Sequence, residues 1–256
     1  MRTATCVVAV ACVAAAAAMA AVDNPMQYGA GSAAVHATLS DGWRTHLYEW
    51  GSYGIGGESL FAHPQFITVD GQGSVYVTDL GNKRVQKFDS QGVFLAAWGE
   101  QGSADGQFRY PSGIATDGAY IYVADRDLNR VQKFDANGNY IAQWGSGGNA
   151  EGMLRMPTGM AVGADGYVYV VDTGNHRVQK FTSDGEFLLS FGGSGTEPGR
   201  FILPHSIDVT DDGSLYVSDR GAGRIDHYTA NGTYVASHVF DASGPFEFMP
   251  ESIKLG

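Results

Sequence analysis

The sequence predicts an all-β fold, a β-propeller made of four-stranded antiparallel blades. The first observation is a ten-residue motif centred on DTGNHRVQKF, which recurs in four copies. The copies carry their aspartates at Asp79, Asp125, Asp172 and Asp219, spaced 46 or 47 residues apart. The second is composition: 36 glycines and 12% aromatic residues favour short strands joined by tight turns over helices. Four strands in a period of about 40–50 residues describe one propeller blade.

Each period contains four short segments rich in β-branched and aromatic residues. In the second copy they are residues 111–117, 120–125, 130–135 and 139–145. Asp-Gly or Asn-Gly pairs such as Asp117-Gly118 separate them, and these residues tolerate the positive φ of hairpin turns. A proline opens each period, which gives repeats at about 64–110, 111–156, 157–203 and 204–249 and a partial repeat at 250–256.

These anchors resemble NHL repeats. The resemblance rests on the P-x-G-I-A-x-D opening, the Y-V-x-D strand, the G-N-x-R-V-Q-K-F core and the W-G close, and it covers roughly residues 46–256. It implies a β-propeller, most similar to an exported bacterial or archaeal NHL-repeat protein. It does not select a function, because NHL-type propellers serve as protein-binding, RNA-binding and enzymatic modules.

The strands at the two ends of the repeat region do not complete a blade. Residues 46–51 match the last strand of a blade, and residues 250–256 match only a first strand. We therefore expect four complete blades plus flanking single strands, from a truncated five- or six-bladed ring, six being the number usual for the family. The alternatives are a natural chain that closes with a two-stranded blade, or closure by dimerisation.

The N-terminus has the pattern of an export signal. Arg2 precedes an uncharged run at residues 6–22, and Ala18-Met19-Ala20 gives the small-residue site that signal peptidase accepts. We expect a signal peptide at 1–20, a leader or linker at 21–45, the propeller at 46–256, and a protein that is secreted or held at the cell surface. The alternative is an uncleaved N-terminal membrane anchor.

Composition limits the kind of partner and chemistry. Both cysteines, Cys6 and Cys12, lie in the predicted signal, so the mature chain would lack disulfides, thiolate zinc sites and cysteine nucleophiles. The formal charge of -11 disfavours nucleic acid as a partner, since phosphate backbones would be repelled. The remaining classes of partner are a protein and an extracellular polymer. We expect no membrane contact beyond the alternative of an N-terminal anchor.

Charged residues that recur in every copy are interpreted as structural, because a catalytic site is needed only once. A carboxylate and a guanidinium five residues apart across a turn can pair, or the carboxylate can cap loop amides. The repeated pairs are Asp79 with Arg84, Asp125 with Arg130, Asp172 with Arg177 and Asp219 with Arg224. The series Trp50, Trp98 and Trp144 likewise predicts packing between blades.

Positions that differ between copies are the candidates for binding. The meander places the loops between blades and the turns after the repeated aspartates on one face, here called the loop face. Its arginines and histidines could receive an acidic or hydroxylated ligand, although a solvated rim without a ligand is the alternative. The predicted ligand-binding residues are Gln65, Ser112, Arg126, Thr158, Thr173, His176, His205, Arg220 and Glu251.

The sequence does not identify a reaction. Only His63 and His205 flank blade-opening prolines, without a matching third ligand, so we expect no catalytic residues, no metal and no cofactor. The favoured function is a rigid protein- or polymer-binding scaffold. The alternative is a metal-dependent lyase or hydrolase with a site at the central channel mouth, because some propellers of this kind resemble lyases that hold zinc with channel histidines.

Overall fold

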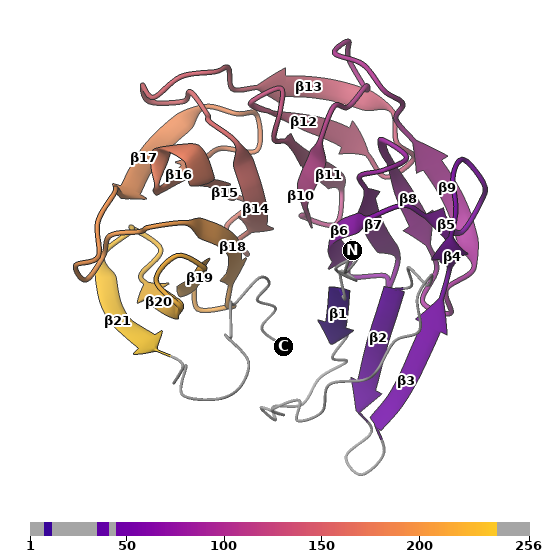
Figure 1. Cartoon of the computed structure of the whole chain (residues 1–256), viewed down its shortest axis with the longest axis horizontal. Helices are drawn as coiled ribbons and strands as arrows, with labels where there is room; N and C mark the ends of the chain where they lie inside the picture. The colour runs from indigo at the N-terminus through magenta and orange to yellow at the C-terminus, as the bar shows by residue number, and fades with distance from the viewer. Residues whose placement is uncertain (1–7, 12–34, 41–44, 240–256) are drawn as a thin grey trace, which may run out of the picture.

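The computed structural model describes residues 8–11, 35–40 and 45–239, and its main body is a ring of four blades around a channel (Figure 1). Each blade is a four-stranded antiparallel meander, as the sequence predicts. The first two blades consist of β6 (Pro64–Val69), β7 (Val75–Asp79), β8 (Arg84–Phe88) and β9 (Phe94–Trp98), then β10 (Pro111–Thr116), β11 (Tyr120–Asp125), β12 (Arg130–Asp135) and β13 (Tyr140–Trp144). The third and fourth consist of β14 (Pro157–Val162), β15 (Val168–Asp172), β16 (Arg177–Phe181) and β17 (Phe187–Gly192), then β18 (Pro204–Val209), β19 (Leu215–Asp219), β20 (Arg224–Tyr228) and β21 (Tyr234–Val239).

Smaller elements lie before the first blade. β1 (Val8–Ala11), β2 (Val35–Ser40) and β3 (Thr45–Trp50) form a three-stranded sheet, and β4 (Ser52–Tyr53) pairs with β5 (Leu60–Phe61). β3 occupies the strand expected at 46–51. β2 falls inside the segment expected as a leader, so a strand precedes that one. Most of the expected signal peptide, and the partial repeat 250–256 with Glu251, lie outside the described residues.

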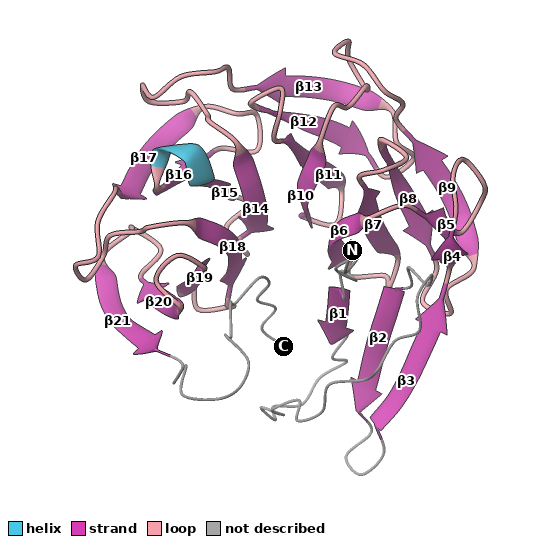
Figure 2. Cartoon of the chain, in the orientation of Figure 1, coloured by secondary structure: helices cyan, strands magenta, loops and turns pink. Residues whose placement is uncertain are grey.

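Helix is confined, within the described ranges, to η1 (Thr173–Asn175), a single 3₁₀ turn on the loop face (Figure 2). Among these residues there is accordingly no helix long and apolar enough to cross a membrane.

The inner strands of neighbouring blades approach very closely. A Cβ on Gly113 in β10 would lie 2.0 Å from the carbonyl oxygen of Thr158, and one on Gly159 in β14 would lie 2.6 Å from that of His205. A side chain at either position would push two blades apart. This approach explains the glycine that follows the blade-opening proline in the second and third copies.

Aromatic side chains fill the spaces between blades. Trp98 of the first blade contacts Phe134 of the second at a ring-centroid distance of 6.0 Å, and Trp144 contacts Phe181 of the third at 6.1 Å. Both indoles also lie against a hairpin glycine of the following blade: a Cβ on Gly138 would be 2.6 Å from Trp98. The described tryptophans of the repeated series therefore pack between blades, while the side chain of Trp50 lies outside the description.

Candidate functional site

The repeated aspartate of the third blade is a buried hydrogen-bond acceptor. Asp172 is 0% exposed. Its Oδ1 accepts the N–H of Arg155 at 2.7 Å. Its Oδ2 accepts from Asn175 Nδ2 at 2.9 Å, Arg177 Nε at 2.8 Å and Gln179 Nε2 at 3.0 Å. This set of contacts, called here the aspartate tether, satisfies a charge that would otherwise be costly to bury.

The tether holds the loop that leads into the blade. Arg177 Nη2 donates to the carbonyls of Ala150 at 2.8 Å and Met153 at 2.9 Å, and Gln179 Nε2 donates to Met153 at 2.6 Å. The first blade repeats the arrangement around Asp79, with equivalent donors at Asn82, Arg84 and Gln86. The interblade loops are therefore fixed to the sheets by side chains of the repeat.

The second and fourth blades keep the loop capping but not the ion pair. Asp125 accepts the N–H groups of Arg109 at 2.8 Å and Tyr110 at 3.0 Å. Arg130 donates instead to loop carbonyls, and its Nε has no hydrogen-bond partner among the described residues. In the fourth blade Asp219 accepts the N–H groups of Ile202 and Leu203, both at 2.8 Å. There Arg224 pairs with Asp226 at 3.0 Å.

Three of the predicted ligand-binding residues are buried hydroxyls: Ser112, Thr158 and Thr173. Each donates to a backbone carbonyl of the following blade, at 2.9 Å for Ser112, 2.7 Å for Thr158 and 2.8 Å for Thr173. The sequence predicts Ser112 and Thr158 near the channel mouth and Thr173 in the turn after the repeated aspartate, and in the structure all three hydroxyls are buried against the following blade. The close approach at Gly113 and Gly159 is the reason.

Two further predicted residues, Gln65 and His205, lie on inner strands. The His205 ring in β18 stacks on Phe66 in β6, at a centroid distance of 5.5 Å. These strands belong to the fourth and first blades and border the channel from different sides (Figure 1). Gln65, next to Phe66 in β6, is half-buried. Both residues therefore lie on strands that border the same channel.

His176 spans the junction between the third and fourth blades. It adopts the left-handed conformation with φ 56°, and its Nδ1 lies 2.8 Å from the carbonyl oxygen of Ile202. Asn129 has the equivalent role at the preceding junction, where its Oδ1 accepts the N–H of Met156 at 2.8 Å. His176 therefore links the turn of the third blade to the loop that enters the fourth.

The remaining two, Arg126 and Arg220, stand at the inner edge of the loop face. The guanidinium of Arg126 lies over the ring of Tyr110 at 4.8 Å, and its N–H donates to the Tyr110 carbonyl at 3.0 Å. The N–H of Arg220 donates to the Leu203 carbonyl at 3.0 Å. In each case the turn after the repeated aspartate is joined to the residue before the proline.

We call these joined segments the inner rim: residues 62–63, 80–83, 109–110, 126–129, 155–156, 173–176, 202–203 and 220–223. The charge of the inner rim is opposite to that of the whole chain, which is -11. Its cations are Lys83, Arg109, Arg126, Arg155 and Arg220, and its one acid is Asp127. The adjoining interblade loops of the same face carry Glu100, Asp105, Glu151 and Glu197, so the positive charge is confined to the inner rim.

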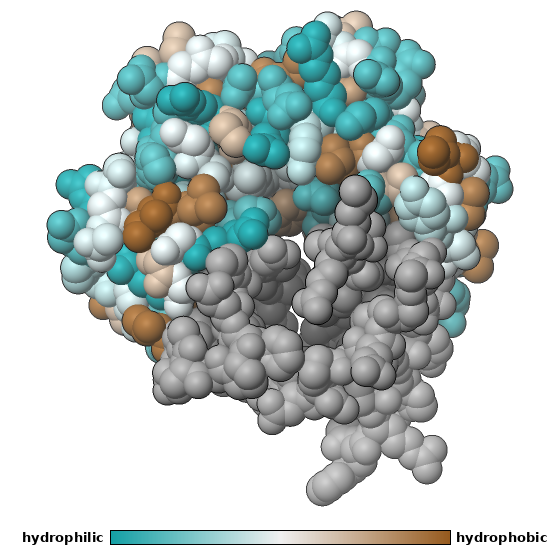
Figure 3. All heavy atoms as spheres, in the orientation of Figure 1, coloured by the Kyte–Doolittle hydropathy of each residue, from teal (hydrophilic) through white to brown (hydrophobic). Residues whose placement is uncertain are grey.

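Apolar side chains are exposed beside these cations. Ile55 is 81% exposed and Leu203 is 43% exposed, with Met153, Met156 and Ile202 at 37–38%. Figure 3 views this face and shows hydrophobic surface interspersed with hydrophilic surface. Apolar groups mixed with arginine are typical of surfaces that bind proteins.

The opposite face is acidic, and the carboxylates of Asp70, Asp117 and Asp135 are engaged in their own turns. Asp135 accepts the N–H groups of Asn137 at 2.8 Å and Asn139 at 2.9 Å. The hydrogen bond from the Asn139 side chain lowers the pKa of Asp135. Asp70 and Asp117 accept from their turn amides and from a tyrosine hydroxyl in the same way.

The described residues contain no group of three or more histidines, cysteines, aspartates or glutamates that could hold a metal ion. His63 is exposed before the first proline, and His205 stacks on Phe66. The alternative of a metal-dependent lyase or hydrolase stays a prediction, which metal analysis of the purified protein would test.

Two rim arginines, Arg109 and Arg155, are missing from the predicted ligand-binding set. Both precede blade-opening prolines at a repeated position, so in the sequence they resemble structural residues of the repeat. The sequence does contain a signal that distinguishes them: the equivalent position holds Ala62 in the first copy and Ile202 in the fourth. A repeated frame residue would be charged in all four.

Comparison with known proteins supports the repeat. Residues 61–88 and 154–181 match the NHL repeat model, so the first and third blades carry NHL repeats. A stretch of 67 residues is 36% identical to Protein brain tumor of Drosophila melanogaster, and it spans 26% of this chain and 6% of that protein.

Solved structures show the same fold at low sequence identity. Virginiamycin B lyase from Staphylococcus aureus is 18% identical with a TM-score of 0.57, over 77% of this chain and 60% of the lyase. A chain of the nidogen/laminin complex is 17% identical with a TM-score of 0.57, over 76% of this chain and 68% of its own length. This chain thus spans about 60% of the lyase, and the likeness is one of fold.

Proposed function

We propose that the protein is an exported scaffold that binds a protein or polymer partner through its loop face. The observation that carries the proposal is the inner rim, where cations and exposed apolar side chains meet on a chain with a net charge of -11. Arginine with apolar neighbours suits an acidic partner surface.

The rigidity of this face supports a scaffold. The aspartate tethers cap the interblade loops in all four blades, so the loops are held before a partner arrives. Binding to a prearranged surface loses less conformational entropy than binding to mobile loops. The nidogen/laminin complex, which contains a similar fold, is a complex between proteins, and on this analogy a protein is the favoured partner.

The test is capture of partners from native extracts with variants that have the same net charge. Arg109→Gln with Arg126→Gln removes two positive charges from the inner rim. Gln72→Glu with Gln91→Glu adds two negative charges to exposed turns of the opposite face. The first variant should lose the captured partner and the second should retain it, because only the first alters the binding surface.

The same assay can contradict the proposal. Equal capture by the rim variant and the wild-type protein would remove the loop face as the binding surface. Equal loss by both variants would show that overall charge, and not the inner rim, governs capture. Thermal unfolding of each variant checks that the fold is intact.

Export is proposed from the N-terminal pattern and has its own test. Expression of the full chain in a host with signal peptidase should release a mature protein that begins at Ala21, as N-terminal sequencing would show. A product that retains Met1 and stays with the membrane fraction would support the anchor alternative.

A further inference from the structure

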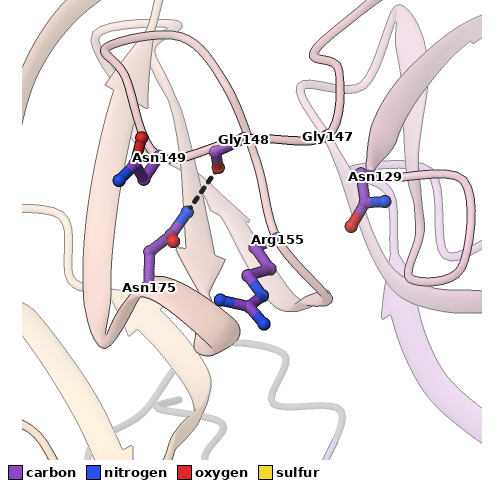
Figure 4. A pocket seen from close by; sticks show the side chains of 6 residues that line it. All are labelled: Asn129, Gly147, Gly148, Asn149, Arg155 and Asn175. Atoms are coloured by element: carbon purple, nitrogen blue, oxygen red, sulfur yellow. Dashed lines mark hydrogen bonds between the residues drawn. The ribbon is translucent and has the colours of Figure 1, made fainter.

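A hollow of about 340 Å³ opens on the loop face at the junction of the second and third blades. It is lined by Asn129, Gly147, Gly148, Asn149, Arg155 and Asn175 (Figure 4). This volume is at the lower end of the range for ligand sites, about 300–1,000 Å³, and fits a small group better than a large molecule.

The hollow contains the side chain of Arg155, an exposed arginine with no counter-charge among the lining residues. Within the part of the chain that the structure describes, no hydrogen bond or ion pair joins the guanidinium of Arg155 to another residue, and none of the six lining residues is acidic. Figure 4 shows the guanidinium between Asn175 and Asn129. Arginine presents up to five N–H donors in a planar fork that matches a carboxylate.

The amide side chains of the walls are held in place. Asn175 Nδ2 donates to the Gly148 carbonyl at 2.9 Å and to Asp172 Oδ2 at 2.9 Å. Asn129 is fixed by its contact with the N–H of Met156. A ligand would thus meet polar walls whose orientation is already set, by the aspartate tether for Asn175 and by the N–H of Met156 for Asn129.

The other described junctions lack this combination. At the junction of the first and second blades Arg109 is present, but Gln101 replaces Gly147 and Leu128 replaces Asn175. At the junction of the third and fourth, the corresponding residues are Ser194, Ile202 and Ala222. A binding site that the protein needs only once is expected at a junction whose residues differ from those of the other junctions.

We propose that this hollow binds a carboxylate, and that its source is an acidic side chain of a protein partner. Met153 and Met156, each 38% exposed, lie two residues before and one residue after Arg155 in the chain, and the Met153 sulfur lies beside Gly148 of the hollow. A peptide supplies apolar neighbours for an acidic side chain, whereas a polyuronate does not, so the methionines favour a protein. The choice of a protein rests on the proposed function; binding of a carboxylate does not.

The first test uses a small probe. N-acetylglutamate α-amide is titrated into the full chain, and the Arg155 Nε–H and the asparagine side-chain amides are followed by NMR. These signals should shift, and N-acetylglutamine α-amide, which lacks the charge, should bind about tenfold or more weakly, since a charge-assisted hydrogen bond contributes that much. Equal affinity for the two probes, or unchanged signals, would overturn the proposal.

Variants locate the site, and the chain provides a matched control. Arg155→Gln should weaken binding of the glutamate probe about tenfold or more. Gly147→Gln should do the same by filling the hollow: a Cβ there meets only Asn129, at 3.5 Å or more, and Gln101 holds the equivalent position. Arg200→Gln removes an equal charge from the exposed loop between the third and fourth blades, outside the inner rim, and should leave affinity unchanged. Equal loss for Arg200→Gln would show that general charge attraction is the cause.

Longer probes identify the source of the carboxylate. A glutamate-containing peptide with apolar neighbours should bind the wild-type chain more tightly than the free probe, and Arg155→Gln should abolish this advantage. Tighter binding of an oligouronate would overturn the protein source. If the glutamate probe binds at Arg155 while neither the rim variant nor Arg155→Gln captures less partner than the wild type, the proposed function fails and the carboxylate site stands.

Discussion

The third and fourth blades both cap their incoming loop and pair their repeated arginine, but they use different carboxylates to do so. In the third, one carboxylate, Asp172, caps the incoming loop and also pairs with Arg177 at 2.8 Å. In the fourth, Asp219 caps the loop, while Arg224 pairs with a second buried carboxylate, Asp226, at 3.0 Å. Asp226 stands where the other blades have a glutamine.

The difference between these blades shows which feature of the repeat is indispensable. Loop capping by the aspartate is present in all four blades, whereas its ion pair with the arginine is present in the first and third. The arginine keeps its bonds to loop carbonyls in every blade, whichever carboxylate it meets. The essential element is thus the fixed interblade loop.

The largest effect should come from Asp172→Ala. It leaves Arg177 half-buried without a carboxylate and removes the acceptor of a loop amide, so we expect a loss of about 3–5 kcal/mol in the free energy of unfolding. Asp219→Ala should cost less, about 1–3 kcal/mol, because Arg224 keeps Asp226. Urea unfolding measures both. Equal losses would show that the ion pair adds nothing to the capping.

The next effect concerns the aromatic contact between blades. A Cβ on Gly185 would lie 2.6 Å from the Trp144 ring, so Gly185→Ala should destabilise by about 1–3 kcal/mol more than a matched glycine. Gly166→Ala is the match, because its φ of 77° is similar to the 87° of Gly185 and nothing lies within 4 Å. Similar losses for the two would mean that the backbone, and not the indole, sets the cost.

A smaller effect is expected at Asp226, and it depends on pH. Burial raises the pKa of Asp226 above its ordinary value of 3.8. The folded state therefore binds more protons than the unfolded state between 3.8 and the folded-state pKa, and this contribution is lost as the pH rises through that window.

Asp226→Gln, which restores the residue of the other blades, should remove this dependence. Relative to the wild type, the variant should lose stability as the pH falls from about 7 toward 3.8, because only the wild type gains from protonation of Asp226. Unfolding curves at a series of pH values test the sign. An advantage that grows as the pH falls would contradict it.

The smallest effect is expected at the exposed link between the second and third blades. Lys133 Nζ lies 2.9 Å from Asp184 Oδ1, but the Asp184 side chain is 86% exposed. Asp184→Asn should therefore cost less than about 1 kcal/mol, and the cost should fall with added salt. A larger, salt-independent loss would place this pair among the structural contacts.

Most of the fold could be predicted from the sequence because the same strand and turn signals occur in all four copies of the repeat. The proline, the turn glycines and the repeated aspartate mark each strand, and four blades lie at those positions. The division of partners around Asp219 depends on Arg224 and Asp226, which are two residues apart in β20 and therefore lie on the same face of the sheet. Spacing alone gives the residues within reach of a tether, but not which carboxylate the arginine selects.

The candidate site could be predicted from the sequence less well than the fold. Ser112 and Thr158 differ between copies, which indicates binding, yet the close approach of inner strands buries both hydroxyls. Arg155 stands at a partly repeated position, which indicates a frame residue. Its guanidinium faces a hollow because Gly147 has no side chain and the Asn175 side chain is bonded to Gly148 and Asp172. These residues come from separate segments of the chain, so no single motif predicts the site.

The tethers fix the interblade loops of the ring, and under the proposed function the loop face binds the partner. Hydrogen exchange of the chain with and without its captured partner separates these two roles in one experiment. We expect protection in the interblade loops and the turns after the repeated aspartates, above all at 146–156 and 126–129, with the opposite hairpins unchanged. Protection confined to those hairpins or to the outer strands would contradict this assignment of roles.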